Sequence, residues 1–245
     1  MDNEAPVAVS VWDLPTRLFH WLLLVVFAFQ AASGWIGGKL MQLHLYSGYA
    51  LLILVVFRIL WGFVGGTHAR FASFIAGPGP TLRFARRLFS RQAVPQLGHN
   101  PLGGWSVILM LASLALQGAT GLLANDGVMS EGPLAKWISI DTSNLLSEVH
   151  RWNFWVLAVL SGLHVVAVAY HWIVKKDNLV VPMFTGVKQV PRAFIRERRE
   201  ARRGSPLRRS ASRELSAFHD PGWRRAALVF GISLTVVAVL VSVGG

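Results

Sequence analysis

The chain has no cysteine among its 245 residues. This absence excludes disulfides, thiolate metal sites, iron–sulfur clusters and haem attached covalently through a C-x-x-C-H motif. Any metal or redox chemistry must therefore use histidine.

Charged residues are also scarce. They make up 15% of the chain, against about 25% in a soluble domain, while apolar residues make up 53% and the mean hydropathy is +0.46. The balance is basic, with 24 Lys and Arg against 12 Asp and Glu. Because the basic residues lie in loops between long apolar runs, the pattern indicates a membrane protein rather than a nucleic-acid-binding one.

Five apolar stretches are long enough to cross a bilayer as helices, which takes about 20 residues. They are residues 18–35, 43–64, 103–124, 149–174 and 226–243. Unbroken runs of this length are helices, because lipid leaves no other way to satisfy the backbone. The first run is not expected to be a cleaved signal peptide, since few positive residues precede it and no A-x-A-like site follows.

The loop charges predict an orientation. The segment 65–102 carries five arginines and no acid, and 175–225 carries fourteen basic residues against five acids. The segment 125–148 has one lysine against four acids. We therefore expect a multi-pass membrane protein with its N-terminus in the cytoplasm and its C-terminus on the other side of the membrane. Tryptophans near the predicted helix ends fit an interfacial belt; they are Trp12, Trp35, Trp105, Trp152, Trp172 and Trp223.

The strongly basic stretch 192–213 has two interpretations. It can bind anionic lipid headgroups or an acidic partner, or it can be a solvated cytoplasmic linker that follows the positive-inside rule.

Histidines are concentrated in the predicted spans. Ionisable groups inside a membrane are costly and usually functional. Five of the eight histidines lie in or at the ends of these helices: His20, His44, His150, His164 and His171.

His150 and His164 lie 14 residues apart on one predicted helix. This separation is about 21 Å and close to four full turns, so the two side chains share a face at opposite leaflets. The predicted orientation puts His20 near the inner surface and His44 near the outer surface. Each leaflet therefore receives one histidine from this helix and one from another.

This arrangement fits two bis-histidine b-type haems stacked across a helix bundle. Zinc or iron sites would normally need three or four clustered ligands, often carboxylates. The two leaflet groups are too far apart to share a metal ion, and no span supplies a buried acid.

Several other residues are candidates for contacts with the haems. Gly34 and Gly48 lie at the outer level, where a small residue lets a flat macrocycle approach or simply allows helix packing. Arg58, 14 residues after His44, can pair with a propionate or extend to the inner headgroups. Arg17 and Arg151 neighbour the candidate ligands and can do likewise or anchor at the interface.

His171 remains ambiguous. It lies two turns beyond His164, and three interpretations stay open: an axial ligand paired with His20, a proton-exchanging group at a quinone pocket, or an interfacial histidine. His68, His99 and His219 fall in loops, where surface exposure is expected.

With these residues in place, the chain resembles the bacterial di-haem cytochrome b-561 family, related to the cytochrome b subunits of hydrogenases and formate dehydrogenases. The resemblance covers about residues 8–186. It rests on VWDLPTRLFHW (11–21), LHLYSGYALL…FRILWGFVG (43–65), GHNPLGGWS (98–106), the GLLANDG stretch, and VHRWNF…GLHVVAVAYHWIVKKDNLVVPMFTG (149–186).

The resemblance implies a four-helix bundle with two b haems, held by His20 with His164 and by His44 with His150, and a quinone-linked role for His171. The expected domains are a di-haem cytochrome b domain over 1–186, a basic linker over 187–225 and an additional membrane helix over 226–245. The fifth helix and the linker depart from the four-helix pattern.

The expected function is transmembrane electron transfer between the quinone pool and a redox partner such as a c-type cytochrome. Alternatives are a quinone-reducing oxidoreductase with a small-molecule donor such as superoxide, or a histidine-lined metal transporter. The sequence leaves enzyme activity, the direction of electron flow and homo-oligomer formation open.

The predicted orientation is testable with fused reporters. A reporter active only in the periplasm is expected to be active when fused after Gly245 and inactive when fused at Ser205. The reverse pattern would overturn the argument from loop charges.

Overall fold

The computed structural model describes residues 5–88, 96–128, 130–196 and 221–244. Contacts divide the chain into two compact units. One unit takes its residues from Met1–Arg17, Gly62–Trp105 and Val165–Gly222. The other takes Leu18–Trp61, Ser106–His164 and Trp223–Gly245. We call the second unit the bundle unit and the first the loop unit.

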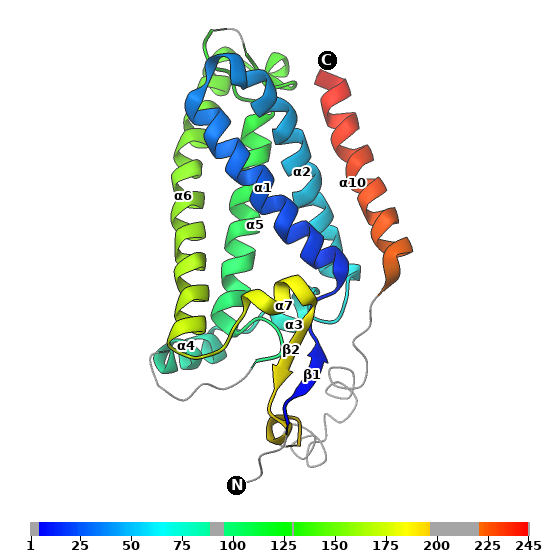
Figure 1. Cartoon of the computed structure of the whole chain (residues 1–245). Coiled ribbons are helices and arrows are strands. Elements are labelled where there is room, and N and C mark those ends of the chain that lie inside the picture. The colour runs from blue at the N-terminus through cyan, green and yellow to red at the C-terminus, as the bar shows by residue number, and fades with distance from the viewer. Residues whose placement is uncertain (1–4, 89–95, 129, 197–220, 245) are drawn as a thin grey trace. The chain divides into compact units, whose positions relative to one another are not determined.

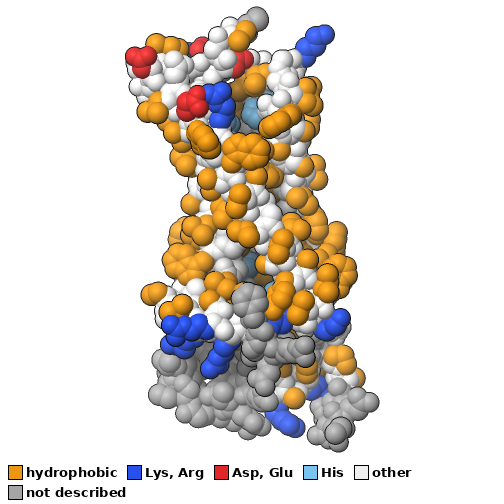
Figure 2. All heavy atoms as spheres, turned by 90° about the vertical axis from the view of Figure 1, so that its left-hand side faces the viewer, with side chains coloured by type: hydrophobic (Ala, Val, Ile, Leu, Met, Phe, Trp, Pro, Cys, Tyr) orange, Lys and Arg blue, Asp and Glu red, His pale blue; other side chains and the backbone are white. Residues whose placement is uncertain are grey.

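The structure is mostly helical, and five of its described helices are long and apolar enough to cross a membrane. They are α1 (Leu14–Ile36), α2 (Met41–Val64, preceded by the short 3-10 helix Gly38–Leu40), α5 (Pro101–Gly121), α6 (Ile140–Ile173) and α10 (Gly222–Gly244) (Figure 1). The predicted fold, a four-helix membrane bundle plus a fifth C-terminal helix, is confirmed. Hydrophobic side chains cover the outer faces of the helices (Figure 2), as lipid contact requires.

The centre of the bundle unit is formed by four helices. Leu51 and Val55 of α2, Leu114 of α5 and Leu157 of α6 form one buried cluster. Leu23, Val26 and Phe27 of α1 pack against it. These contacts hold the four helices around a common interior.

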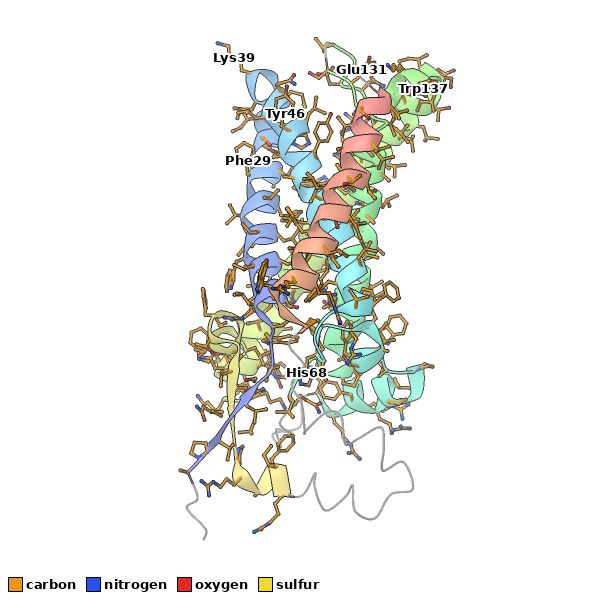
Figure 3. All side chains as sticks on the ribbon, turned by 90° about the vertical axis from the view of Figure 1, so that its right-hand side faces the viewer. Phe29, Lys39, Tyr46, His68, Glu131 and Trp137 are labelled. Atoms are coloured by element: carbon orange, nitrogen blue, oxygen red, sulfur yellow. The ribbon has the colours of Figure 1, made fainter. Side chains whose placement is uncertain are left out.

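The fifth helix packs on the outside of this arrangement. Val237 of α10 lies in a second buried cluster with Leu52 of α2 and Leu122. The indole nitrogen of Trp137 donates to the Val243 carbonyl at 3.2 Å, which ties the end of α10 to the loop between α5 and α6. In Figure 3, Lys39, Glu131 and Trp137 lie at this same end of the bundle unit.

Helix α6 begins nine residues earlier than the apolar run 149–174 predicted. Ser139 precedes the helix, and its hydroxyl accepts from the Thr142 backbone amide at 3.3 Å. Such a cap satisfies one of the free amides of the first turn, and Asp141 adds a favourable negative charge there. The helix therefore extends through polar residues that hydropathy alone does not assign to a span.

The loop unit contains a small sheet. Strands β1 (Val7–Ser10) and β2 (Val187–Val190) are antiparallel, with Val7 opposite Val190. Short helices α3 (Phe71–Phe74), α4 (Pro78–Arg87) and α7 (Val180–Thr185) belong to the same unit. The first four residues of the segment expected to be a linker thus form a strand, and residues 197–220 of that segment lie outside the described residues.

A buried carboxylate organises part of the loop unit. Asp13 is only 3% exposed. Its oxygens accept from the Thr16 amide at 2.8 Å and the Gly66 amide at 2.9 Å. The side chain thereby caps the first turn of α1 and fixes that turn to the segment that follows α2.

Within the bundle unit, a polar group links α5 to α6. The Asn153 amide donates to the Ser113 carbonyl at 2.9 Å and to Gln117 Oε1 at 2.6 Å. The Ser113 hydroxyl donates to Asn153 Oδ1 at 2.7 Å. Polar side chains buried in a membrane protein are stable when they are satisfied by a neighbouring helix in this way.

Replacing Asn153 with Leu should destabilise the bundle by about 1–2 kcal/mol, because Gln117 and the Ser113 hydroxyl lose their interhelical partner. The measurement is unfolding in mixed micelles of rising SDS fraction. Thr235→Val is the control, since within the part of the chain that the structure describes that hydroxyl bonds only to the Gly231 carbonyl of its own helix. Equal midpoints for the two variants would contradict an interhelical role for Asn153.

Candidate functional site

Two pairs of histidine rings face each other inside the bundle unit. His20 of α1 and His164 of α6 have ring centres 6.4 Å apart. His44 of α2 and His150 of α6 have ring centres 6.3 Å apart. The structure therefore brings together the two histidine pairs that the family resemblance implies.

The separation within each pair matches a defined coordination geometry. Imidazole nitrogens bind a transition metal at about 2.0–2.1 Å, so two rings on opposite sides of one metal ion have centres about 6 Å apart. Among the described residues, no group of three or more His, Cys, Asp or Glu is arranged to hold a metal ion. The histidines thus occur as facing pairs rather than as clusters.

We call His44–His150 the outer pair and His20–His164 the inner pair, after the leaflets that the loop charges predict for them. In the outer pair, hydrogen bonds to Nδ1 orient each ring. His150 Nδ1 lies 3.0 Å from the Gln117 carbonyl. Since a carbonyl only accepts, Nδ1 carries the proton, and Nε2 keeps the lone pair that a metal ligand needs. His44 Nδ1 lies 3.2 Å from the Ser33 hydroxyl, and the Thr120 hydroxyl lies 3.2 Å from His150 Nδ1.

The inner pair has a different environment. His20 Nδ1 is buried and has no hydrogen-bond partner within the described residues. A buried polar atom of this kind is costly unless another group satisfies the ring. Among the described residues, His20 thus lacks the hydrogen bond that orients the ring of His150.

Glycines stand directly beside the outer imidazoles. A Cβ atom at Gly34 would lie 2.9 Å from His44 Cε1, and one at Gly121 would lie 3.1 Å from His150 Cε1. At Gly48, a Cβ would lie 3.1 Å from the Gln30 amide nitrogen. A side chain at position 34 would displace the His44 ring.

The outer pair opens into a cavity of about 640 Å³ between α1, α2, α5 and α6. This volume is within the range of sites that enclose a large organic ligand. Apolar side chains such as Phe27, Leu51 and Leu114 line its interior. The polar groups at its loop end include Asp126, Glu131 and Glu148.

The three candidate arginines have different surroundings. Arg58 on α2 is buried, with 3% of its surface exposed. Arg17 donates from Nη1 to the Phe184 carbonyl. Arg151 is largely exposed and pairs with Glu148.

His171 lies in the loop unit, near the end of α6. The Asp177 amide donates to the His171 carbonyl at 3.0 Å. The Asp177 carboxylate pairs with Lys188 Nζ at 2.8 Å, and Lys188 also donates to the Gln96 carbonyl at 3.0 Å. This ion pair stabilises the turn that follows His171.

The full surface exposure expected for the loop histidines is not observed for the two that are described, which have intermediate exposure. His99 packs against Trp12 and Phe74, with ring centres 4.8 Å and 4.7 Å apart. His68 lies 6.5 Å from the Trp12 ring. Aromatic residues of the loop unit contact both imidazoles, while His219 lies outside the described residues.

The sequence interpretation missed the residues that orient the outer histidines. They are Gln30, Ser33, Gln117, Thr120 and Asn153. Each is a polar residue inside a predicted apolar span, and that unusual placement was the available signal.

Paired imidazoles from facing helices of a membrane bundle are typical of a membrane-bound b-type cytochrome. The model of the family "Prokaryotic cytochrome b561" matches residues 11–186, and the chain belongs to this family. Membership implies a b-type haem and electron transfer in the membrane.

Relatives at low identity are named as b-type cytochrome subunits. A probable Ni/Fe-hydrogenase B-type cytochrome subunit of Rhizobium leguminosarum bv. viciae is 24% identical, over 73% of this chain and 88% of its own length. Its counterpart from Azotobacter chroococcum mcd 1 is 27% identical, over 73% and 88%. No solved structure matches the chain.

The glycine beside His44 yields a testable prediction. Gly34→Val should lower the haem content of the purified protein, because the new side chain collides with the His44 ring. Gly231→Val is the matched control, since a Cβ at that exposed position of α10 meets no atom within 4 Å. Full haem content in Gly34→Val, measured by the pyridine haemochrome assay, would show that the ring tolerates the displacement.

Proposed function

We propose that the chain carries electrons across the membrane through two b haems, one between His20 and His164 and the other between His44 and His150. The observation that carries the proposal is the separation of the facing rings, 6.4 Å and 6.3 Å. A single pair would serve one haem. Two pairs on one face of α6, about 21 Å apart along the helix, favour a route between the two leaflets.

The haem iron supplies reversible one-electron oxidation and reduction when it is bound. The chain provides the ligands and their orientation. Gln117 holds the His150 ring through its backbone carbonyl, and Asn153 holds the Gln117 side chain. The Gln30 side chain donates to the His44 carbonyl at 2.9 Å and supports that turn of α2.

Arg58 is our candidate partner for a haem propionate at the inner level. Its burial supports a role inside the bundle over an extension to the headgroups. Arg17 and Arg151 already interact with the Phe184 carbonyl and with Glu148, so we propose interfacial anchoring for both. Gly34 and Gly48 are proposed to admit the outer macrocycle.

We propose that a quinone or quinol exchanges electrons and protons near His171. The imidazole can accept or release a proton, and the adjoining Asp177–Lys188 pair fixes the turn that follows it. This proposal rests on the position of His171 at the end of α6 and on the family resemblance, which implies a role for this residue in the reaction with quinone.

We propose that the haem farther from the quinone exchanges electrons with a redox protein, such as a c-type cytochrome or a dehydrogenase subunit. Relatives are named as cytochrome subunits of Ni/Fe-hydrogenases. An anionic small-molecule electron donor such as superoxide is disfavoured. Arg151 would be the cation that attracts it, and Arg151 is already paired with Glu148. A metal transporter is disfavoured by the paired rather than clustered histidines.

We further propose that the protein lies in the bacterial inner membrane with its N-terminus in the cytoplasm and its C-terminus in the periplasm. The loop charges support this orientation. The bond between Trp137 and the Val243 carbonyl supports the same side for the α5–α6 loop and the end of α10.

Ligand substitutions test the two-haem proposal. His44→Ala and His150→Ala should each lose the outer haem and keep the inner one, so that haem per chain falls by half. His20→Ala and His164→Ala should lose the inner haem instead, and potentiometric titration distinguishes the haem that remains. Loss of both haems from a folded His44→Ala protein would contradict independent sites.

His171→Ala should keep both haems, since a proton-exchanging group does not ligate iron. Reduction by a water-soluble quinol, followed by stopped-flow absorption, should slow by roughly tenfold or more, as expected for loss of a general acid or base. If His171→Ala lost one haem while His164→Ala retained two, the inner ligand would be His171.

A further inference from the structure

Helix α4 (Pro78–Arg87) has two distinct faces. At 100° per residue, Arg83, Arg86 and Arg87 fall within an arc of about 100°. All three arginines are exposed, whereas Phe84 and Ala85 on the other side are half-buried. The apolar side therefore packs on the protein, and the arginine side faces outward.

Both ends of α4 are held by membrane-spanning helices. The indole nitrogen of Trp105, in the first turns of α5, donates to the Ala76 carbonyl at 3.0 Å, just before α4 begins. The Tyr170 hydroxyl, in the last turn of α6, donates to the Leu88 carbonyl at 3.2 Å, just after α4 ends. Helix α4 therefore runs between the end of one span and the end of another.

This position defines the depth of α4. The ends of membrane-spanning helices lie at the membrane–water interface, where tryptophan and tyrosine are enriched. A helix fixed at both ends to such turns lies at the level of the lipid headgroups. Its exposed arginines are then within reach of phosphate groups rather than far out in solution.

The surroundings of α4 strengthen its positive charge. The segment 65–102 contains no acid. Lys175 Nζ lies 5.6 Å from the centre of the Tyr170 ring and adds a cation beside the end of α4. Apolar side chains are also exposed next to the arginines, with Leu82 at 53% and Ile75 at 44% exposure.

We propose that α4 is an interfacial binding site for anionic phospholipid, with Arg83, Arg86 and Arg87 contacting the phosphate group. A basic helix at headgroup level binds anionic lipid through its cations. Exposed leucine and isoleucine beside the cations fit acyl chains, which an acidic protein surface does not offer. The lipid is thus favoured over an acidic protein partner.

The test uses full-length, haem-loaded protein in detergent, titrated with phosphatidylglycerol or phosphatidylcholine, with bound lipid counted by native mass spectrometry. Wild-type protein should retain phosphatidylglycerol preferentially. The variant R83Q/R86Q/R87Q should bind it more weakly, by roughly fivefold for each arginine removed. Phosphatidylcholine binding should not change.

The matched control for the smaller variant R83Q/R86Q is K39Q/K136Q, because it removes two exposed lysines from the segments that precede α2 and α6, and the segment 125–148 around Lys136 carries four acids. K39Q/K136Q should retain wild-type affinity, and an unchanged haem spectrum should establish that the variants are folded. An equal loss in R83Q/R86Q and K39Q/K136Q, or no preference for phosphatidylglycerol in the wild type, would overturn the proposal. Unchanged lipid binding by R83Q/R86Q/R87Q with lost binding of polyglutamate would assign α4 to an acidic protein instead.

Discussion

The structure depends on one constraint, which is that two imidazole rings must face each other across about 6 Å at two levels of a helical bundle. Helix α6 supplies one ring at each level because His150 and His164 are separated by close to four turns. Helix α2 supplies the partner for one level and α1 for the other. The interior of the bundle unit has to keep these distances, so small residues such as Gly34 and Gly121 stand beside the rings.

Polar groups near the outer pair have to be satisfied inside an apolar interior. The Gln117 carbonyl accepts a hydrogen bond from His150 Nδ1, and the Gln117 side chain in turn accepts one from Asn153. This chain of hydrogen bonds links α5 to α6 and fixes which nitrogen of His150 can bind a metal. Stability of the bundle and orientation of the ligand therefore rest on the same contacts.

Much of this arrangement could be predicted from the sequence. The spans follow from hydropathy because lipid demands long apolar helices, and the levels of His44 and His150 follow from helical periodicity and alternating direction. Periodicity left both His164 and His171 open as the partner of His20, and the family resemblance favoured His164. The early start of α6 could not be predicted from hydropathy, since it depends on the Ser139 cap. The pairing of Val7–Ser10 with Val187–Val190 joins two short strands about 180 residues apart, and no local pattern indicates it. The contact of His99 with Trp12 likewise depends on tertiary packing.

The most direct test of the central claim is a spin-quantified electron paramagnetic resonance spectrum of the fully oxidised protein. Two bis-histidine haems should give low-spin ferric signals that integrate to two spins per chain. A single low-spin haem per chain, or a high-spin signal from iron with an open axial position, would contradict the assignment of two facing histidine pairs.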